Sequence, residues 1–277
     1  MNQLRFHWLE GGHCRHLEKS TYRLGAWKAL DYPSFFGVLE HPGEGIFLFD
    51  TGYSPRFHEA TAHLPEKIYA MMTPVTCSEA DTSHAQLRKL GHSPDDVKGI
   101  FVSHFHADHM AALHYFPKAK LYFVGAGLRK MQSLARWRQV KSGFLAGLLP
   151  TDIWKRAVML EDARPVSLPA LLAPFTRGFD FLGDGSMLAV PLEGHMLGHT
   201  GLFFQSQKGP VFLIADAVWH SESYRRQVGP LFAARLLMHD WAEYQETIRR
   251  LHELHKRGGE LQLVPSHCTE FRGVFSG

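Results

Sequence analysis

Short apolar runs in the first half of the chain predict buried β-strands. Phe35 to Leu39 and Ile46 to Asp50 flank the turn sequence His41-Pro42-Gly43-Glu44-Gly45, which predicts a β-hairpin. Two further runs, Val97 to Val102 and Leu121 to Val124, have the length and composition of buried strands. A short helix ended by Gly91 is predicted over residues 83–90, before these runs, and another helix over residues 107–115, between them.

The second half repeats this alternation of strands and helices. The apolar runs are Leu188 to Pro191, Leu202 to Gln205 and Val211 to Ala215. From Trp241 to His255 apolar residues recur at helical spacing, with an Asp240–Glu243 cap before them and Gly258 after them. Strands interleaved with helices in both halves predict a layered α/β sandwich, in which helices cover two sheets.

Residues 125–175 depart from this rhythm and predict a helical insertion. Basic residues follow one another without an acid from Arg129 to Lys141, and Met131, Leu134, Trp137 and Val140 recur among them at helical spacing. An amphipathic insertion packed on the sandwich is one interpretation. The others are a lid or an apolar wall of a substrate pocket, and a helix on a membrane surface.

Composition narrows the classes of protein that remain. The formal net charge of +3 is too small to indicate nucleic-acid binding, and no apolar run approaches the length of a membrane span. Three widely spaced cysteines and a start without a secretory apolar region favour a cytoplasmic protein without a disulfide framework. Without a linker or a repeat, we expect a single domain over residues 1–277.

Histidines and aspartates gather directly after the strand predicted at Val97 to Val102. The sequence there is His104-Phe105-His106-Ala107-Asp108-His109. Alternate residues of an extended segment point the same way, so His104 and His106 can face one ion, while Asp108 and His109 follow where a turn could aim them at a second. Imidazole and carboxylate ligands suit zinc and, less selectively, iron or manganese.

This sequence resembles the His-x-His-x-Asp-His signature of the metallo-β-lactamase-fold hydrolases, and the resemblance covers about residues 30 to 270. His195 in Glu193-Gly194-His195, Asp216 after the run Val211 to Ala215, and His267 after Leu261 to Ser266 fit that family's later ligands. Phe49-Asp50-Thr51-Gly52 resembles its early strand-to-loop turn. The resemblance implies an αββα sandwich of two mixed sheets flanked by helices.

The resemblance also implies a centre of two divalent metal ions. His104, His106 and His195 would bind the first ion, Asp108, His109 and His267 the second, and Asp216 would bridge them. Zn²⁺ is the expected metal, with Fe or Mn as alternatives. A hydroxide bridging the ions would attack a carbonyl, and Asp108 would pass its proton to the leaving group. We expect His199, four residues after His195, to support the centre by hydrogen bonding.

Within that family the layout is most similar to the N-acyl homoserine lactone lactonases, a likeness that includes a Gly11-Gly12-His13-Cys14 loop. We therefore expect hydrolysis of an acyl lactone or related ester, with a homodimer as an open option and no nucleic-acid partner. Two positions depart from the lactonases: Trp219 replaces a substrate-binding Tyr, and Ala111-Ala112 replaces Gly-Gly. Trp219 would line the substrate pocket, and a different ester stays open. The alternatives are a thioesterase of the glyoxalase-II type and a metal-containing ligand-binding effector without turnover.

Overall fold

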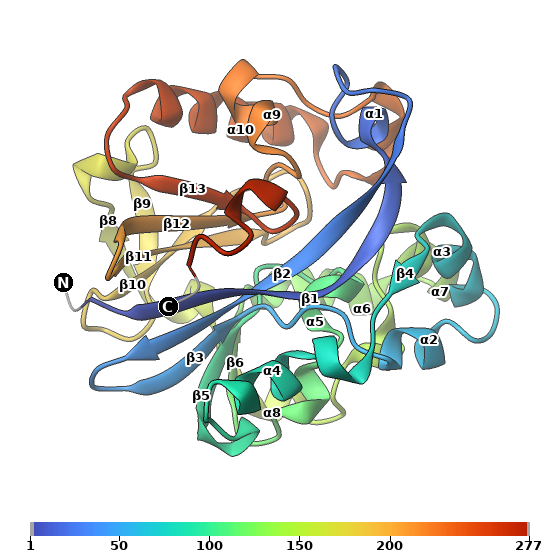
Figure 1. Ribbon diagram of the computed structural model, residues 1–277, viewed down its shortest axis with the longest axis horizontal. Coiled ribbons are helices and arrows are strands. Elements are labelled where there is room, and N and C mark those ends of the chain that lie inside the picture. The colour runs from blue at the N-terminus through green and yellow to red at the C-terminus, as the bar shows by residue number, and fades with distance from the viewer. Residues whose placement is uncertain (1–2, 276–277) are drawn as a thin grey trace.

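A computed structural model describes residues 3–275 and contains two β-sheets that face each other. The first sheet has the strand order β4-β1-β2-β3-β5-β6-β7, and the second has the order β13-β12-β11-β10-β9-β8. Helices lie outside both sheets (Figure 1). The αββα sandwich that the resemblance implies is therefore confirmed.

The bounds of the strands are β1 (Arg5–Leu17), β2 (Ala29–His41), β3 (Gly45–Phe49), β4 (Val75–Thr76), β5 (Val97–Phe101), β6 (Lys120–Phe123), β7 (Ala157–Met159), β8 (Arg164–Ser167), β9 (Arg177–Asp180), β10 (Met187–Pro191), β11 (Thr200–Ser206), β12 (Gly209–Ala215) and β13 (Gln262–Pro265).

The α-helices are α1 (Glu18–Thr21), α2 (Arg56–Ala60), α3 (Glu66–Met72), α4 (Ser83–Lys89), α5 (Ala107–Met110), α6 (Gly125–Ser133), α7 (Arg136–Lys141), α8 (Ile153–Arg156), α9 (Ser221–Arg226) and α10 (Trp241–Lys256). Short 3₁₀ helices are η1 (Glu79–Asp81), η2 (Pro94–Asp96), η3 (Leu113–Tyr115), η4 (Ala146–Leu148), η5 (Leu160–Asp162), η6 (Ala170–Leu172), η7 (Phe232–Leu237) and η8 (Thr269–Phe271). Among the described residues, none of these helices combines the length and apolar character that crossing a bilayer requires.

Three apolar layers explain why the strand sequences are so uniformly apolar. Along β12, Leu213 packs between the two sheets, whereas its neighbours Phe212 and Ile214 pack under α9 and α10. Along β2, Phe35 lies between the sheets and Phe36 faces the helices of the first half. Both faces of these strands are buried, so polar residues do not alternate with apolar ones.

The predicted 107–115 helix is interrupted. It consists of α5 and η3, with Ala111 and Ala112 between them. Groups from an earlier loop take the carbonyls that a continuous helix would use: Ser54 Oγ donates to Ala111 O at 2.7 Å, and Thr51 N donates to His109 O at 3.0 Å. These bonds fix the turn that carries Asp108 and His109.

The predicted helical insertion at 125–175 is α-helical only in its first part. After α8 the chain forms β7, which joins the first sheet, and β8, which joins the second. These edge strands of three and four residues are partly exposed, so they show no apolar alternation that the sequence could reveal. The Gly11-Gly12-His13-Cys14 segment is likewise not a loop: it lies within β1, at a bulge between Glu10 and His13.

Candidate metal centre and cavity

The predicted site residues lie at the carboxyl ends of strands that share one edge of the sandwich. β3 runs parallel to β5, and β12 runs parallel to β13. His104 follows β5, His195 follows β10, Asp216 follows β12 and His267 follows β13. Loops at this edge can converge on one point because parallel strands end on the same side. The structure thus brings together all seven residues that were predicted to bind the metals.

Donor atoms form two groups, which we name by their chemistry. The imidazole group consists of His104, His106 and His195 with Asp216 Oδ2, and the carboxylate group consists of Asp108, His109 and His267 with Asp216 Oδ1. Within the first, His106 Nδ1 lies 3.0 Å from His104 Nε2 and 3.1 Å from His195 Nε2. Asp216 therefore presents one oxygen to each group.

The carboxylate group is equally close. Asp108 Oδ2 lies 3.3 Å from His109 Nε2 and 3.2 Å from His267 Nε2. Asp216 Oδ1 lies 3.3 Å and 3.1 Å from the same two nitrogens. Ligands arranged tetrahedrally around Zn²⁺ at its usual bond lengths are about 3.3 Å apart.

Outer hydrogen bonds decide which ring nitrogen of His109, His267 and His106 faces the centre. His109 Nδ1 donates to Asp50 Oδ2 at 2.7 Å, and His267 Nδ1 donates to the Pro33 carbonyl at 2.7 Å. His106 Nε2 donates to the Ser142 carbonyl at 3.1 Å. Each bond points one ring nitrogen away from the centre and turns the other toward it, so that the inner nitrogen is the one that can bind a metal ion.

Asp50 and Ser103 support two rings at once. Ser103 Oγ donates to Asp50 Oδ2 at 2.8 Å and so accepts from His104 Nδ1 at 3.0 Å. Burial raises the pKa of Asp50, although its contacts with His109 and Ser103 oppose that shift. Asp50 was expected in a turn, with no role in the site. An Asp directly after an apolar strand was the available signal for it.

The free nitrogens make the case that the residues fit metal ions. His104 Nε2 and His106 Nδ1 face each other at 3.0 Å, and neither carries a proton when the outer nitrogens donate. Two facing lone pairs repel, and a cation between them removes the repulsion. Buried His109 Nε2 and Asp216 Oδ1 also lack a hydrogen-bond partner inside the cluster.

The two groups differ in their electrostatics. Burial, helped by neighbouring imidazoles, lowers the pKa of His104 and His195 well below its usual value. Burial also acts to lower the pKa of His267, but Asp216 and Asp108 outweigh it and raise that pKa to about 10. The same balance holds the pKa of Asp216 well below its usual value despite burial. Without metal, the imidazoles of the first group are neutral, while those of the second form ion pairs with the aspartates.

Backbone strain accompanies the shared ligand. Ala215, directly before Asp216, has a φ of +44°, and Asp50 has a φ of +57°. Such left-handed conformations are costly for residues other than glycine and concentrate at functional sites. At the opposite wall Gly143 has a φ of +70°, and a Cβ there would lie 2.6 Å from the His106 ring. His106 thus packs directly against glycine backbone.

These residues and their order match a known family. The sequence profile of the Metallo-beta-lactamase superfamily matches residues 30–256. The chain belongs to this superfamily. The superfamily is hydrolytic, so the prediction of a metal-dependent hydrolase is confirmed at that level.

Relatives within the superfamily include proteins named as lactonases. The chain is 25% identical over 280 residues to N-acyl homoserine lactonase AttM of Azorhizobium caulinodans, covering 96% of this chain and 94% of that protein. It is 23% identical over 241 residues to a probable metallo-hydrolase of Mycobacterium tuberculosis, covering 83% and 73% of the two chains.

A solved structure of an N-acyl homoserine lactone hydrolase with the product N-hexanoyl-L-homoserine at its metal centre has the same fold. The TM-score is 0.72 at 18% identity, over 99% of this chain and 96% of that one.

A cavity of about 670 Å³ opens above the metal-donor residues. His106, Asp108, His195, Asp216 and His267 lie at its base. Its walls are mainly apolar and come from segments distant in sequence: Ile68, Tyr69, Met72, Trp137, Val140, Leu231, Leu236 and Leu237. Within the insertion, α7 lines the cavity, while Phe144 and Leu148 are buried in the core.

Trp219 and His199 both contact Asp216. Trp219 lines the cavity, and its Nε1 donates to Asp216 Oδ2 at 2.8 Å. His199 Nε2 accepts from the Asp216 backbone N–H at 3.1 Å, and its Nδ1 donates to the Leu192 carbonyl at 3.0 Å. With both ring nitrogens occupied, His199 has no lone pair for a metal.

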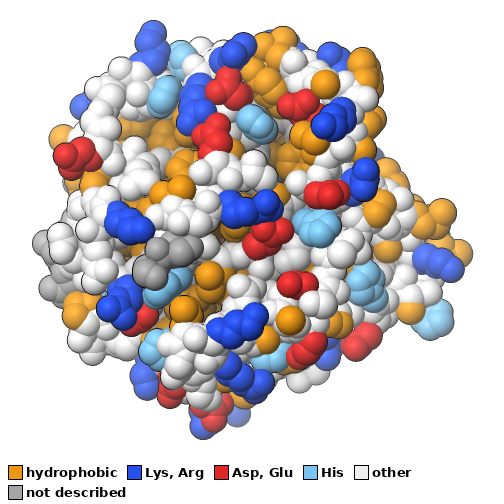
Figure 2. Space-filling view, viewed as in Figure 1, with side chains coloured by type: hydrophobic (Ala, Val, Ile, Leu, Met, Phe, Trp, Pro, Cys, Tyr) orange, Lys and Arg blue, Asp and Glu red, His pale blue; other side chains and the backbone are white. Residues whose placement is uncertain are grey.

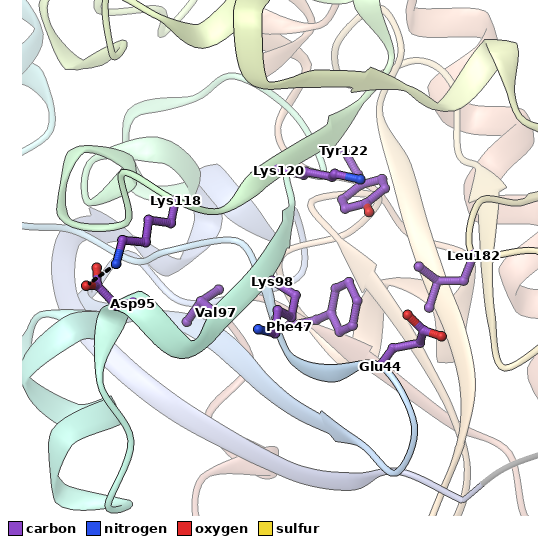
Figure 3. Close-up of a pocket in the computed structure, with 9 residues that line it drawn as sticks. All are labelled: Glu44, Phe47, Asp95, Val97, Lys98, Lys118, Lys120, Tyr122 and Leu182. Atoms are coloured by element: carbon purple, nitrogen blue, oxygen red, sulfur yellow. Dashed lines mark hydrogen bonds and ion pairs between the residues drawn. The ribbon is translucent and has the colours of Figure 1, made fainter.

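A second cavity, of about 480 Å³, lies at the opposite edge of the first sheet (Figure 3). Lys98, Lys118, Lys120 and Tyr122 line it, and Lys118 pairs with Asp95 at 2.7 Å. None of the predicted site residues lines this cavity. The chemistry of the site therefore belongs to the carboxyl-end cavity.

Proposed function

We propose that this protein is a dinuclear metal-dependent hydrolase that opens an acyl lactone or a related ester. One observation carries the proposal: seven donor residues, all buried except the half-buried His106, converge as two groups that share Asp216 beneath an apolar cavity. The name of the AttM relative supports a lactone as the substrate class.

Zn²⁺ is the metal that the donor set favours. Five imidazoles and two carboxylates, with spacings near those of tetrahedral zinc ligands, suit Zn²⁺, while iron and manganese accept the same donors. His104, His106 and His195 would hold one ion, Asp108, His109 and His267 the other, and Asp216 both. When bound, the ions would activate a water and polarise the substrate carbonyl.

The residues of the chain have distinct tasks in this proposal. Asp216 holds the two groups together, and its position is fixed by Trp219 at Oδ2 and by His199 at the backbone N–H. Asp108 lies at the base of the cavity and is ionised, since His109 and His267 outweigh burial and lower its pKa. It can therefore accept a proton there and return it to the leaving oxygen of the substrate.

The cavity walls favour an acyl substrate over a compact polar one. Ile68, Val140 and Leu237 offer apolar surface, which binds methylene groups but gives no hydrogen bonds. Because the Trp219 N–H is already donated to Asp216, this position does not supply the hydrogen bond that the lactonases' Tyr gives the substrate. An ester or lactone that does not need that bond fits best.

Metal analysis combined with a substrate panel tests the proposal. Purified protein should contain about two metal ions per chain, and chelation should abolish acid release from acyl lactones. Aryl esters, thioesters and a phosphodiester in the same panel separate the lactonase from the glyoxalase-II type and from a phosphodiesterase. Metal-loaded protein without turnover on any of them would contradict the proposal and favour a ligand-binding effector. The homodimer and the cytoplasmic location stay predictions.

A further inference from the structure

Large apolar side chains are exposed around the mouth of the carboxyl-end cavity. We call them the apolar rim: Trp27, Met71, Met72, Trp137, Phe232, Leu236 and Leu237. Met72, Trp137, Leu236 and Leu237 also line the cavity, so the rim and the opening coincide. Trp27, Met71, Phe232 and Leu236 are each at least 70% exposed. Apolar surface of this kind around one opening indicates an interaction site.

Hydrogen bonds between segments that are distant in sequence hold the residues of the rim close together. Arg136 on α7 makes two hydrogen bonds of 2.7 Å to Glu66 on α3. On the other side of the mouth, the backbone N–H of Arg23 donates to the Gly229 carbonyl at 3.1 Å, which joins the loop after α1 to the segment before η7. Hydrophobic side chains gather along the right-hand edge of Figure 2, beside α1 and α3.

The segments that carry the rim are strongly basic. Residues 18–28, 64–73, 135–143 and 229–239 contain eight Lys and Arg but only two Asp and Glu, whereas the whole chain has 30 and 27. The rest of the molecule is therefore slightly acidic. Glu66 is occupied by Arg136, and Glu18 accepts from the Ala26 backbone N–H.

Several of the bases are free to meet a partner. Among the described residues, no ion pair is formed by Arg23, Lys28, Lys67, Arg138 or Lys141. Lys19 lies 5.4 Å from the Trp27 ring centroid, and Arg235 lies 5.3 Å from that of Phe232. Basic side chains beside exposed aromatic rings are suited to a partner surface that offers both phosphate groups and hydrocarbon chains.

We propose that the apolar rim docks on the surface of an anionic phospholipid bilayer. Its apolar side chains would enter the boundary between headgroups and acyl chains, and the surrounding bases would contact the lipid phosphates. A second copy of the chain fits less well, because a two-fold interface would set this basic surface against itself. One consequence rests on the proposed function: acyl substrates dissolved in the bilayer would enter the cavity directly through this mouth.

Vesicle flotation without substrate tests the docking separately from the proposed activity. The protein should float with vesicles of phosphatidylcholine containing about 30% phosphatidylglycerol, and weakly with pure phosphatidylcholine. The Lys67→Ser/Arg138→Ser pair should bind about 30-fold more weakly, at about 1 kcal/mol per base. The matched control Arg88→Ser/Lys89→Ser removes the same charge from α4 and should bind as the wild type does.

The apolar contribution needs its own variants. Met71→Asp/Phe232→Asp should reduce binding at least tenfold, whereas Val274→Asp, at an exposed apolar position outside the rim, should bind as the wild type does. Trp27 and Trp137 fluorescence should shift to the blue on binding. Absent binding, equal binding to neutral vesicles, equal loss in the control pair, or a dimer that the rim variants dissociate would each overturn the proposal.

Discussion

The imidazole group and the carboxylate group use similar residues but respond to the loss of metal in opposite ways. In the carboxylate group, Asp108 and Asp216 raise the pKa of His267, so protons can take the place of a cation and hold the group together. In the imidazole group, His104 and His195 stay neutral, and lone pairs face one another at about the distance of a hydrogen bond. The imidazole group therefore depends on a metal for its order, while the carboxylate group has ion pairs as a substitute.

Removing the residue that both groups share should have the largest effect. Asp216→Ala deletes one oxygen from each group, so we expect metal content well below one ion per chain. Activity should fall by about four orders of magnitude, since each ion contributes several kcal/mol to the transition state. Plasma emission spectroscopy and lactone turnover measure the two effects.

A matched control for that variant is Asp180→Asn. Asp180 is also a buried aspartate, but it accepts from the backbone N–H groups of Gly183 and Gly185, away from the centre. It should retain two ions and near-wild-type turnover. If both variants lost metal equally, the shared role of Asp216 would be wrong.

Changing Asp108 should alter the carboxylate group and leave the imidazole group intact. Asp108→Asn keeps the shape of the side chain but removes its charge and its capacity to accept a proton. We expect a loss in kcat of about a hundredfold to a thousandfold, the usual contribution of a positioned acid or base, with the ion of the imidazole group retained. Full activity with two ions bound would contradict the proton-transfer role.

Replacing Trp219 tests the imidazole group, because Trp219 supports the Asp216 oxygen that belongs to this group. Trp219→Phe removes the N–H donated to Asp216 Oδ2, so zinc affinity should fall by about tenfold, the lower end of the effect of such supporting bonds. KM should change less than metal affinity. The control Trp154→Phe removes an N–H that donates to Gln132, far from the centre, and competitive chelator titration should show no change.

The last predicted effect, a pH dependence, concerns only the metal-free protein. The pKa of His267 is about 10 in the folded protein, against an ordinary value of 6.5 for histidine in the unfolded chain. Its stabilising charge is therefore complete below pH 6.5 and is lost as the pH rises through about 10. The free energy of unfolding should fall by up to about 1.4 kcal/mol per pH unit within that window.

Urea unfolding with EDTA and with two equivalents of zinc measures this effect. A zinc-bound imidazole is neutral, so the slope between about pH 7 and 10 should be absent in the loaded protein. His267→Gln should reduce this slope in the metal-free protein, where His109, whose pKa Asp108, Asp50 and Asp216 raise against the effect of burial, contributes the rest. Parallel profiles with and without zinc would show that the carboxylate group does not hold protons in place of a metal.

Much of this site could be predicted from the sequence because its donors follow strands. The runs before His104, Asp216 and His267 are apolar enough to be recognised, and the loop after each must return to the same edge. The bonds that orient the rings could not be predicted. Pro33 and Ser142 act through backbone carbonyls, which leave no trace in residue type.

The fold, like the site, has parts that could be predicted from the sequence and parts that could not. The hairpin and the central strands were recognisable, whereas β7 and β8 were not, because these short edge strands are partly exposed and lack a clear apolar pattern. Trp219 was expected to line the pocket, and it does, but its bond to Asp216 depends on a loop conformation that spacing does not reveal.

The contact between Gly143 and His106 limits how this enzyme could be redesigned. Any side chain at position 143 would push into the ring and displace Nδ1 from its partners. Loop grafts intended to enlarge the carboxyl-end cavity from the α7 side must therefore keep a glycine at this position. A substitution at Gly147 meets no such barrier, because a Cβ there would only reach Ala60 at 3.6 Å.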